Sequence, residues 1–227
     1  MIAAVLFDLD ETLLDRTGSL TDFLADQHAR FADKLGGIAL KRFRERFLAL
    51  DARGSVHKSV VYPALLAEIG GASDAAGSLL EDYMQNSCRY ARPFQGMEDV
   101  VAALRGRGLK LGIVSNGETA LQWRSIDALG LQMDAVLISQ AEGVRKPDAA
   151  IFSRAAERLG VTPEQCLFVG DNPAADVLGA RNAGMQSVWF DNGLTWPESE
   201  PEGETIRQLA DLLALPFFVS TAVNLRA

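Results

Sequence analysis

Short runs of bulky apolar and β-branched residues recur along the chain, and in its second half they alternate with amphipathic segments. Five of these runs have the length and composition of buried strands: Ala3–Asp8, Lys110–Ser115, Ala135–Ser139, Cys166–Gly170 and Gln186–Asp191. Helical spacing of apolar residues fills the intervals over 96–107, around 121–129 and over 147–159, and a Gly follows each of these segments. Repeated strand–helix units predict an α/β fold with a mainly parallel sheet and helices on both faces.

The interval between the first two strands has a different pattern. From Leu20 to about Tyr90 the apolar residues recur at helical spacing, and the Gly36-Gly37 and Gly70-Gly71 pairs are typical of turns. This predicts a small helical domain of residues 17–91, inserted into a sheet domain made of residues 1–16 and 92–227.

The segment after the fifth strand is harder to interpret. The stretch 194–204 is rich in Pro, Glu and Gly and indicates a loop, and Thr205–Leu215 has the pattern of an amphipathic helix. The final residues, 216–227, are apolar and short, and the sequence does not place them.

Composition and charge exclude several classes of protein. The chain is 48% hydrophobic with a net charge of −8, which is globular but argues against binding nucleic acid or an anionic membrane surface. The N-terminal apolar run is too short for a signal peptide. The two cysteines of the chain, Cys88 and Cys166, lack the spacing of metal ligands. We therefore expect a cytoplasmic protein with reduced thiols; its oligomeric state cannot be read from the sequence.

Two acids, Asp8 and Asp10, directly follow the first apolar strand. Carboxylates two residues apart repel each other unless a cation lies between them or one is protonated, so a divalent metal site or acid–base chemistry would explain them. The alternative is a polar turn where the strand leaves the core, because Asp is common in turns.

Three later strands are also followed by polar residues. Ser115-Asn116-Gly117 follows the second strand, Lys146-Pro147 comes after the third, and Asp171 and Asp176 follow the fourth. Each group has a plain alternative, namely a turn, a solvated lysine or a charge at a helix start. Together the four groups supply acids, a hydroxyl and a lysine. Because the carboxyl ends of parallel strands meet at one edge of a sheet, we expect these side chains to lie close together.

The order and composition of these four groups resemble the motifs of the haloacid dehalogenase-like hydrolase superfamily. The matching residues are Asp8-Leu9-Asp10-Glu11-Thr12, Ser115-Asn116, Lys146-Pro147 and Gly170-Asp171 through Asp176. The resemblance is to phosphatase-type members of subfamily I, in which a helical cap is inserted after the first motif. It implies a Rossmann-like three-layer core plus an inserted α-helical cap domain.

The resemblance also implies a mechanism. Asp8 would attack the phosphorus of a small phosphorylated metabolite, and Asp10 would protonate the leaving oxygen and then activate water. Ser115 and Lys146 would stabilise charge on the transferring group. Mg²⁺ would be held by Asp8, the main-chain carbonyl of Asp10, and Asp171.

Further residues are expected around this centre. Thr12 and Asn116 would contact the substrate, while Asn172 and Asp176 would support the site from behind, Asp176 by orienting Lys146. In the cap, the stretch 51–58 is the candidate for substrate choice, with Arg53 and Lys58 as its cations. A solvated connection explains this stretch equally well. His28, near an apolar helix face, is expected to be structural.

Other activities of the same superfamily remain open. A phosphomutase would carry the same motifs, whereas a 2-haloacid dehalogenase needs neither the second acid nor a metal, so Asp10 and Asp171 argue against it. Phosphonate cleavage would need a cap lysine, for which Lys34, Lys41 and Lys58 qualify only by residue type. A catalytically idle binding module usually lacks a motif acid, and none is missing.

Overall fold

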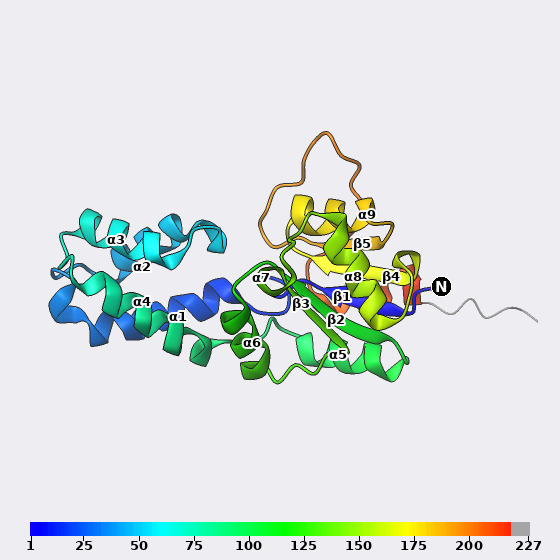
Figure 1. Ribbon diagram of the computed structural model, residues 1–227, viewed down its shortest axis with the longest axis horizontal. Coiled ribbons are helices and arrows are strands. Elements are labelled where there is room, and N and C mark those ends of the chain that lie inside the picture. The colour runs from blue at the N-terminus through cyan, green and yellow to red at the C-terminus, as the bar shows by residue number, and fades with distance from the viewer. Residues whose placement is uncertain (219–227) are drawn as a thin grey trace, which may run out of the picture. The chain divides into compact units, whose positions relative to one another are not determined.

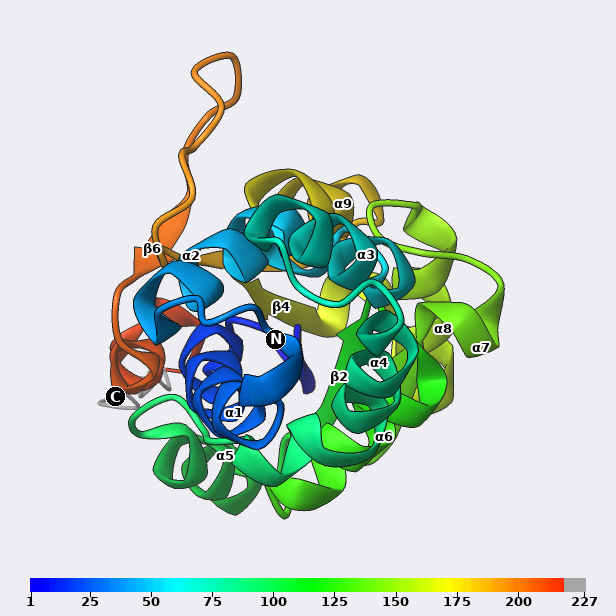
Figure 2. The same ribbon diagram turned by 90° about the vertical axis from the view of Figure 1, so that its left-hand side faces the viewer.

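The computed structural model describes residues 1–218 and is shown from two sides in Figures 1 and 2. It divides into two compact units, one made of Met1–Leu14 with the residues from Pro93 onward, and one made of Asp15–Arg92. Pro216–Phe218 form a single 3₁₀ turn. The rest of the unplaced C-terminal segment, residues 219–227, lies outside the described residues.

The first unit is built on a six-stranded sheet in the order β3-β2-β1-β4-β5-β6, and each neighbouring pair is parallel. The strands are β1 (Ala4–Phe7), β2 (Lys110–Ser115), β3 (Ala135–Ile138), β4 (Cys166–Gly170), β5 (Gln186–Phe190) and β6 (Glu204–Ile206). The predicted α/β class is therefore confirmed. The strand order reverses at β1, and loops after β1, β2 and β4 converge at such a point, which is where ligands bind in open α/β sheets.

Helices cover both faces of this sheet. In both views α8 and α9 lie on one face, and α5 and α6 lie on the other (Figures 1 and 2). The helices of this unit are α5 (Met97–Gly106), α6 (Thr119–Ala128), α7 (Ser139–Glu142), α8 (Ala149–Leu159) and α9 (Gly179–Asn182). The core beneath α8 joins Ile151, Phe152 and Ala155 of this helix to Leu6 and Phe168 of the sheet.

The segment after β5 differs from the sequence-based expectation. The helix predicted over Thr205–Leu215 is wrong in its first half, because β6 pairs with β5 there and a 3₁₀ helix follows over Leu209–Ala214. The main chain favours the strand, since the Asp191 N–H donates to Ile206 O at 2.9 Å and extends the ladder. A three-residue strand is too short to produce a periodic signal of its own.

The second unit is helical. Its four helices are α1 (Arg16–Arg30), α2 (Leu40–Asp51), α3 (Lys58–Ile69) and α4 (Ala75–Asn86), and a 3₁₀ helix, Ser87–Tyr90, follows. Fully buried aromatic side chains fill its centre, among them Phe23, Phe43, Phe47 and Tyr62. His28 is structural here, because its ring contacts Phe43 and its Nε2 lies 2.8 Å from Ile38 O.

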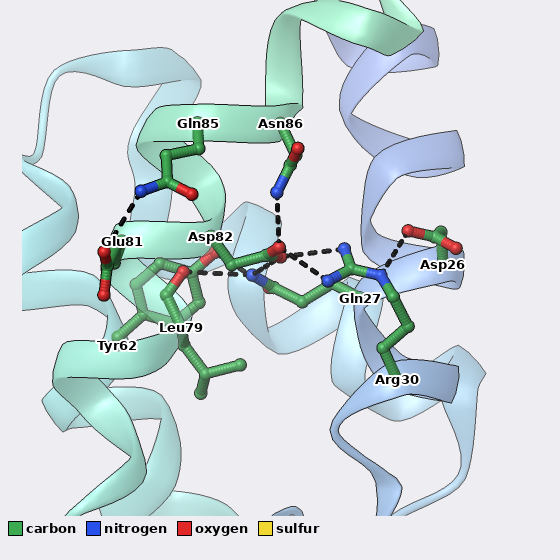
Figure 3. Close-up of polar contacts among 9 residues, drawn as sticks. All are labelled: Asp26, Gln27, Arg30, Tyr62, Leu79, Glu81, Asp82, Gln85 and Asn86. Atoms are coloured by element: carbon green, nitrogen blue, oxygen red, sulfur yellow. Dashed lines mark hydrogen bonds and ion pairs between the residues drawn. The ribbon is translucent and has the colours of Figure 1, made fainter.

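A polar network around Asp82 ties α1, α3 and α4 together (Figure 3). The Asp82 carboxylate accepts hydrogen bonds from Gln27 at 3.0 Å, from both terminal nitrogens of Arg30 at 2.5 and 2.8 Å, and from Asn86 at 2.8 Å. Tyr62 in turn donates to Gln27 Oε1 at 2.8 Å. Because buried polar groups are costly unless they are paired, this network fixes how the three helices meet.

The chain leaves the sheet unit and returns to it at neighbouring residues. Within the sheet unit, Leu14 and Pro93 form an isolated antiparallel bridge. Within the helical unit, the Asp15 N–H donates to Arg92 O at 3.0 Å, and the two side chains form an ion pair at 2.8 Å. The unit is thus an insertion closed at its base. Its bounds differ from the expected 17–91 by two residues at the start and one at the end.

Within residues 1–218, none of the helices combines the length and apolar character needed to cross a bilayer.

Candidate active site

Asp8 continues the line of β1 beyond its last residue. Its N–H donates to Val169 O on β4 at 2.9 Å, so the ladder holds the residue in place. The residue is 6% exposed, and its Oδ1 accepts a hydrogen bond from Lys146 Nζ at 2.5 Å. A buried carboxylate at the centre of the sheet edge is therefore paired with a lysine that comes from the loop after β3.

Lys146 lies between two carboxylates. Besides Asp8, its Nζ lies 2.7 Å from Asp176 Oδ1, and the lysine is almost fully buried. Burial alone would lower the pKa of Lys146, but Asp176 and Asp8 outweigh it, so the pKa is raised above its ordinary value. Lys146 is therefore an ammonium ion, a fixed positive charge in a water-poor site.

Asn116 holds the main chain of Lys146. Its Nδ2 donates to Lys146 O and its Oδ1 accepts from the Lys146 N–H, both at 2.9 Å. We expected Asn116 to contact the substrate, but the structure commits both ends of its amide to Lys146. The helix after Lys146 also begins later than predicted, at Ala149 with Asp148 as its N-cap, and Pro147 lies before it.

Asp176 follows β4 within a π-helix over Pro173–Leu178. Its Oδ2 accepts from the Asn172 N–H at 3.0 Å, while Asn172 Oδ1 accepts from Ala175 N at 2.9 Å and starts the helix. With Lys146 on the other oxygen, the carboxylate is fixed on both sides. Asp176 thus contacts both Asn172 and Lys146, and the supporting roles of Asn172 and Asp176 stay a prediction.

Asp171 is oriented through its main chain. Its N–H donates to Thr12 Oγ1 at 3.1 Å, and its carbonyl accepts from Trp189 Nε1 at 3.0 Å. Thr12 is fully buried, so its hydroxyl serves Asp171 rather than the substrate contact that we expected. Trp189 was not predicted from the sequence; the available signal was its position near the end of β5, the strand next to β4.

The carboxylates of Asp8, Asp171 and Asp176 form a buried cluster, with one oxygen of each within 4.8 Å of the others. Burial raises the pKa of Asp8 well above its usual range, and Asp176 and Asp171 raise it further, while Lys146 opposes them. Three carboxylates face one ammonium ion in this group, so a bound divalent cation would relieve an excess of negative charge. Oxygen ligands of this kind suit Mg²⁺.

Ser115 is the last residue of β2, the strand beside β1. It is 1% exposed, and its Oγ has no hydrogen-bond partner among the described residues. A buried hydroxyl without a partner costs about 1–3 kcal/mol. Such a group is explained if it serves to bind an oxygen of a ligand.

Asp10 lies outside the acidic cluster. Its side chain is partly exposed, and Oδ2 accepts a hydrogen bond from Gln122 Nε2 at 2.8 Å. Gln122 was not predicted from the sequence, because a polar residue in an amphipathic segment is expected to face solvent. In the structure Gln122 and Ser125 are buried there, together with Ile126 and Leu129.

The two candidate cations of the helical unit differ in their surroundings. Lys58 is buried at the start of α3, where its ammonium group forms an ion pair with Asp51 and donates to Val56 O at 3.1 Å. Arg16 bonds the same Asp51 carboxylate through both terminal nitrogens at 2.9 and 3.1 Å. Arg53 is exposed and has a left-handed backbone, with φ of 54°. Lys58 therefore belongs to an internal ion cluster, whereas Arg53 lies at the surface of its unit.

Comparison with known proteins gives consistent results. A family model described as haloacid dehalogenase-like hydrolase matches residues 2–184. A phosphoserine phosphatase of Thermus thermophilus is 34% identical over 92% of this chain and 95% of its own length, and a glyceraldehyde 3-phosphate phosphatase of Methanothermobacter thermautotrophicus is 31% identical over 88% and 90%. Among solved structures, a 2-haloacid dehalogenase from Pseudomonas syringae pv. Tomato is 27% identical, with a TM-score of 0.61 and 94% and 97% coverage.

Proposed function

Because the chain belongs to the haloacid dehalogenase-like hydrolase family, we propose that it is a Mg²⁺-dependent phosphatase that hydrolyses a small phosphate monoester through a phosphoaspartate on Asp8. The observation that carries this proposal is the buried Asp8 carboxylate, bound by Lys146 at the end of the central strand. The two phosphatases compared above act, by their names, on different small phosphate esters.

In the first step, a carboxylate oxygen of Asp8 attacks phosphorus, and the bond between phosphorus and the ester oxygen breaks. Asp10 gives its proton to that leaving oxygen. Lys146 and Ser115 donate to oxygens of the phosphoryl group as charge shifts onto them, which lowers the barrier most effectively in a site that excludes water. The buried Ser115 hydroxyl thereby gains the partner that it lacks.

In the second step, Asp10 is ionised and takes a proton from water. The water oxygen attacks the phosphorus of the phosphoaspartate, the bond to Asp8 breaks, and inorganic phosphate leaves. One carboxyl group therefore serves as acid and then as base, and the reaction is divided into two easier displacements.

Magnesium would be held by the carboxylates of Asp8 and Asp171, with the main-chain carbonyl of Asp10 as the family resemblance implies. When bound, the ion would offset the repulsion between the phosphate and the acidic cluster. Asp176 is assigned to Lys146 rather than to the metal, because the ammonium group and the Asn172 N–H already hold its two oxygens.

Within the helical unit, Arg53 is the stronger candidate for a substrate contact, because Lys58 is used by Asp51. The exposed guanidinium of Arg53 suits a carboxylate or another anionic group of the substrate. Arg53→Ala is expected to raise KM about tenfold while kcat changes little, since uniform binding is lost.

The proposed function is tested by incubating the purified protein with Mg²⁺ and a panel of sugar phosphates, nucleoside monophosphates, phosphoserine, phosphoglycolate and glyceraldehyde 3-phosphate. We expect release of inorganic phosphate from at least one ester. After acid quenching, mass spectrometry should find one phosphoryl group on the peptide that contains Asp8. Turnover retained by Asp8→Asn would refute the mechanism, and isomerised substrate without free phosphate would indicate a mutase.

Dehalogenation is the second candidate, because the chain resembles a solved 2-haloacid dehalogenase over most of its length. Asp10 and Asp171 are unnecessary for that reaction, whereas both are oriented by specific contacts here. Halide release from a 2-haloacid in the presence of EDTA would favour dehalogenation over the phosphatase assignment.

A further inference from the structure

Gln122 is a buried amide side chain with one contact that bears on the proposed chemistry. It lies on α6, is 7% exposed, and donates from Nε2 to Asp10 Oδ2 at 2.8 Å. Among the residues that the structure describes, no other group hydrogen-bonds the Asp10 side chain. We propose that Gln122 is a positioning residue that holds the Asp10 carboxyl group for proton transfer to the leaving oxygen.

Gly117 provides independent support for this role. A Cβ atom at Gly117 would lie 2.4 Å from Gln122 Nε2 and 2.9 Å from its Cγ. The backbone of Gly117 is not left-handed, so the constraint here is space, and a larger residue would displace the Gln122 side chain. The absence of a side chain at Gly117 therefore leaves the space in which the Gln122 side chain extends to Asp10.

The same loop carries Ser115 and Asn116, so one short segment serves three parts of the site. Ser115 ends β2, Asn116 holds the main chain of Lys146, and Gly117 gives room to Gln122. The Gly117 N–H itself donates to Ser139 Oγ at 3.1 Å, which fixes the loop. Placement of Asp10 is thereby tied to placement of the residues that would bind the phosphoryl group.

The chemistry of an amide suits this task. An uncharged N–H donates to a carboxylate oxygen and to the carbonyl oxygen of a protonated acid alike. The bond therefore persists while Asp10 loses a proton in one step and gains one in the next. With Oδ2 bound to Gln122, Oδ1 is the oxygen that exchanges the proton.

This inference rests on the proposed phosphatase function, and its test compares two kinds of ester. An alkyl phosphate needs protonation of its leaving oxygen, whereas the nitrophenolate of p-nitrophenyl phosphate leaves without it. The parameter to measure is kcat/KM, because it reports steps up to formation of the phosphoenzyme. The alkyl ester should be the one that the unmodified protein hydrolyses fastest.

Gln122→Met keeps the length of the side chain and removes the donor. We expect it to lower kcat/KM for the alkyl ester about 10- to 100-fold, in line with the effect of misplacing a catalytic group by about 1 Å. For p-nitrophenyl phosphate the loss should stay within about threefold, and KM should change little for either ester. Gly117→Ala should act in the same direction by displacing Gln122.

Two comparisons separate positioning from a general structural effect. Gln186→Met makes the same substitution at an exposed residue that begins β5, whereas the site residues lie at the carboxyl ends of the strands. It should leave kcat/KM for both esters unchanged. In an Asp10→Asn background, Gln122→Met should cause no further loss, because the group that it positions is already disabled.

Equal losses for the two esters, or additive losses with Asp10→Asn, would overturn the role of Gln122. So would an unchanged ratio of the two kcat/KM values in both Gln122→Met and Gly117→Ala. Failure of the unmodified protein to release phosphate from any ester would instead refute the phosphatase function, so the two failures are distinguishable.

Discussion

The α-carbon of Gly170 faces the carboxylate of Asp176 so closely that a methyl group on it would lie 2.5 Å from the Asp176 side chain. Gly170 ends β4 and its backbone is not left-handed, so glycine is needed there for space. Asp176 can approach Lys146 because this space is empty. The glycine before Asp171 is therefore part of the charge arrangement of the site.

Gly170→Ala is expected to displace Asp176, destabilise the sheet unit by about 1–3 kcal/mol through overpacking and lower kcat. All three tryptophans lie in the sheet unit and all three tyrosines in the helical unit, so urea unfolding followed by tryptophan fluorescence reports the sheet unit selectively. Gly106→Ala, at an exposed position with open space, should stay within about 0.5 kcal/mol. Equal stability of the two variants would contradict the steric argument.

Mg²⁺ should stabilise the sheet unit, because it would offset repulsion within the acidic cluster. At a concentration one hundred times its Kd the gain is about 2.7 kcal/mol, measurable as a higher Tm by tryptophan fluorescence with Mg²⁺ than with EDTA. Asp171→Asn should abolish this gain together with phosphate release. Asp127→Asn, on the exposed side of α6, serves as the control and should keep both. A full Mg²⁺ gain in Asp171→Asn would remove Asp171 from the metal site.

Trp189→Phe removes the N–H that binds the Asp171 carbonyl and keeps an aromatic ring. Substitution of a residue that orients a metal ligand typically lowers metal affinity 10- to 100-fold. We therefore expect the Mg²⁺ concentration for half-maximal activity to rise about tenfold, with nearly unchanged kcat at saturating Mg²⁺. A titration of activity against Mg²⁺ concentration measures this. Trp123→Phe makes the same change at an exposed residue and should leave the titration unaltered. A fall in kcat at saturating Mg²⁺ would point to a different role for Trp189.

The helical unit should lose stability in acid because of Asp51. Burial raises the pKa of this carboxyl, but Arg16 and Lys58 outweigh it and hold the pKa below its ordinary value. As the pH falls below about 4, Asp51 binds a proton more readily in the unfolded chain than in the folded chain. Its contribution to the stability of the folded unit is therefore present at neutral pH and is lost below about pH 4.

Asp51→Asn should therefore destabilise the helical unit at pH 7 by about 3–5 kcal/mol, since the largely buried Arg16 and Lys58 lose the carboxylate that they share, and by progressively less as the pH falls below about 4. Near-ultraviolet circular dichroism of the tyrosines follows this unit during thermal unfolding. Asp33→Asn, at an exposed site, should show neither effect. A cost for Asp51→Asn that does not depend on pH would contradict the linkage.

The parts of this molecule that the sequence predicted well depend on neighbours in the chain. Asp8, Ser115 and Asp171 directly follow or end apolar strands, so each was marked by a local change from apolar to polar residues. Parallel strands bring such ends to one edge whatever the details of packing. The α/β class and the main motif residues were accessible for this reason.

The missed features depend on contacts between distant residues. Asp10 and Gln122 are 112 positions apart, and the Asp51 carboxylate that pairs with Lys58 also binds Arg16, which is 35 positions away. Gln122 of α6 was not predicted to be buried, because Gln is usually found at the surface. Thr12 and Asn116 were expected to contact the substrate as members of the matching motifs, whereas their side chains bond the main chains of Asp171 and Lys146, which are far away in the sequence.

The bridge between Leu14 and Pro93 has a consequence for how such a protein can diversify. The chain enters and leaves the helical unit at neighbouring residues. Leu14 and Pro93 are paired within the sheet unit, and Asp15 and Arg92 are paired within the helical unit. Because the entropy of closing a loop grows only slowly with its length, a longer, shorter or unrelated segment can occupy this position while the registers of β1 and β2 stay the same. Mutation and recombination can thus replace the inserted helices without altering the residues proposed to cleave the ester.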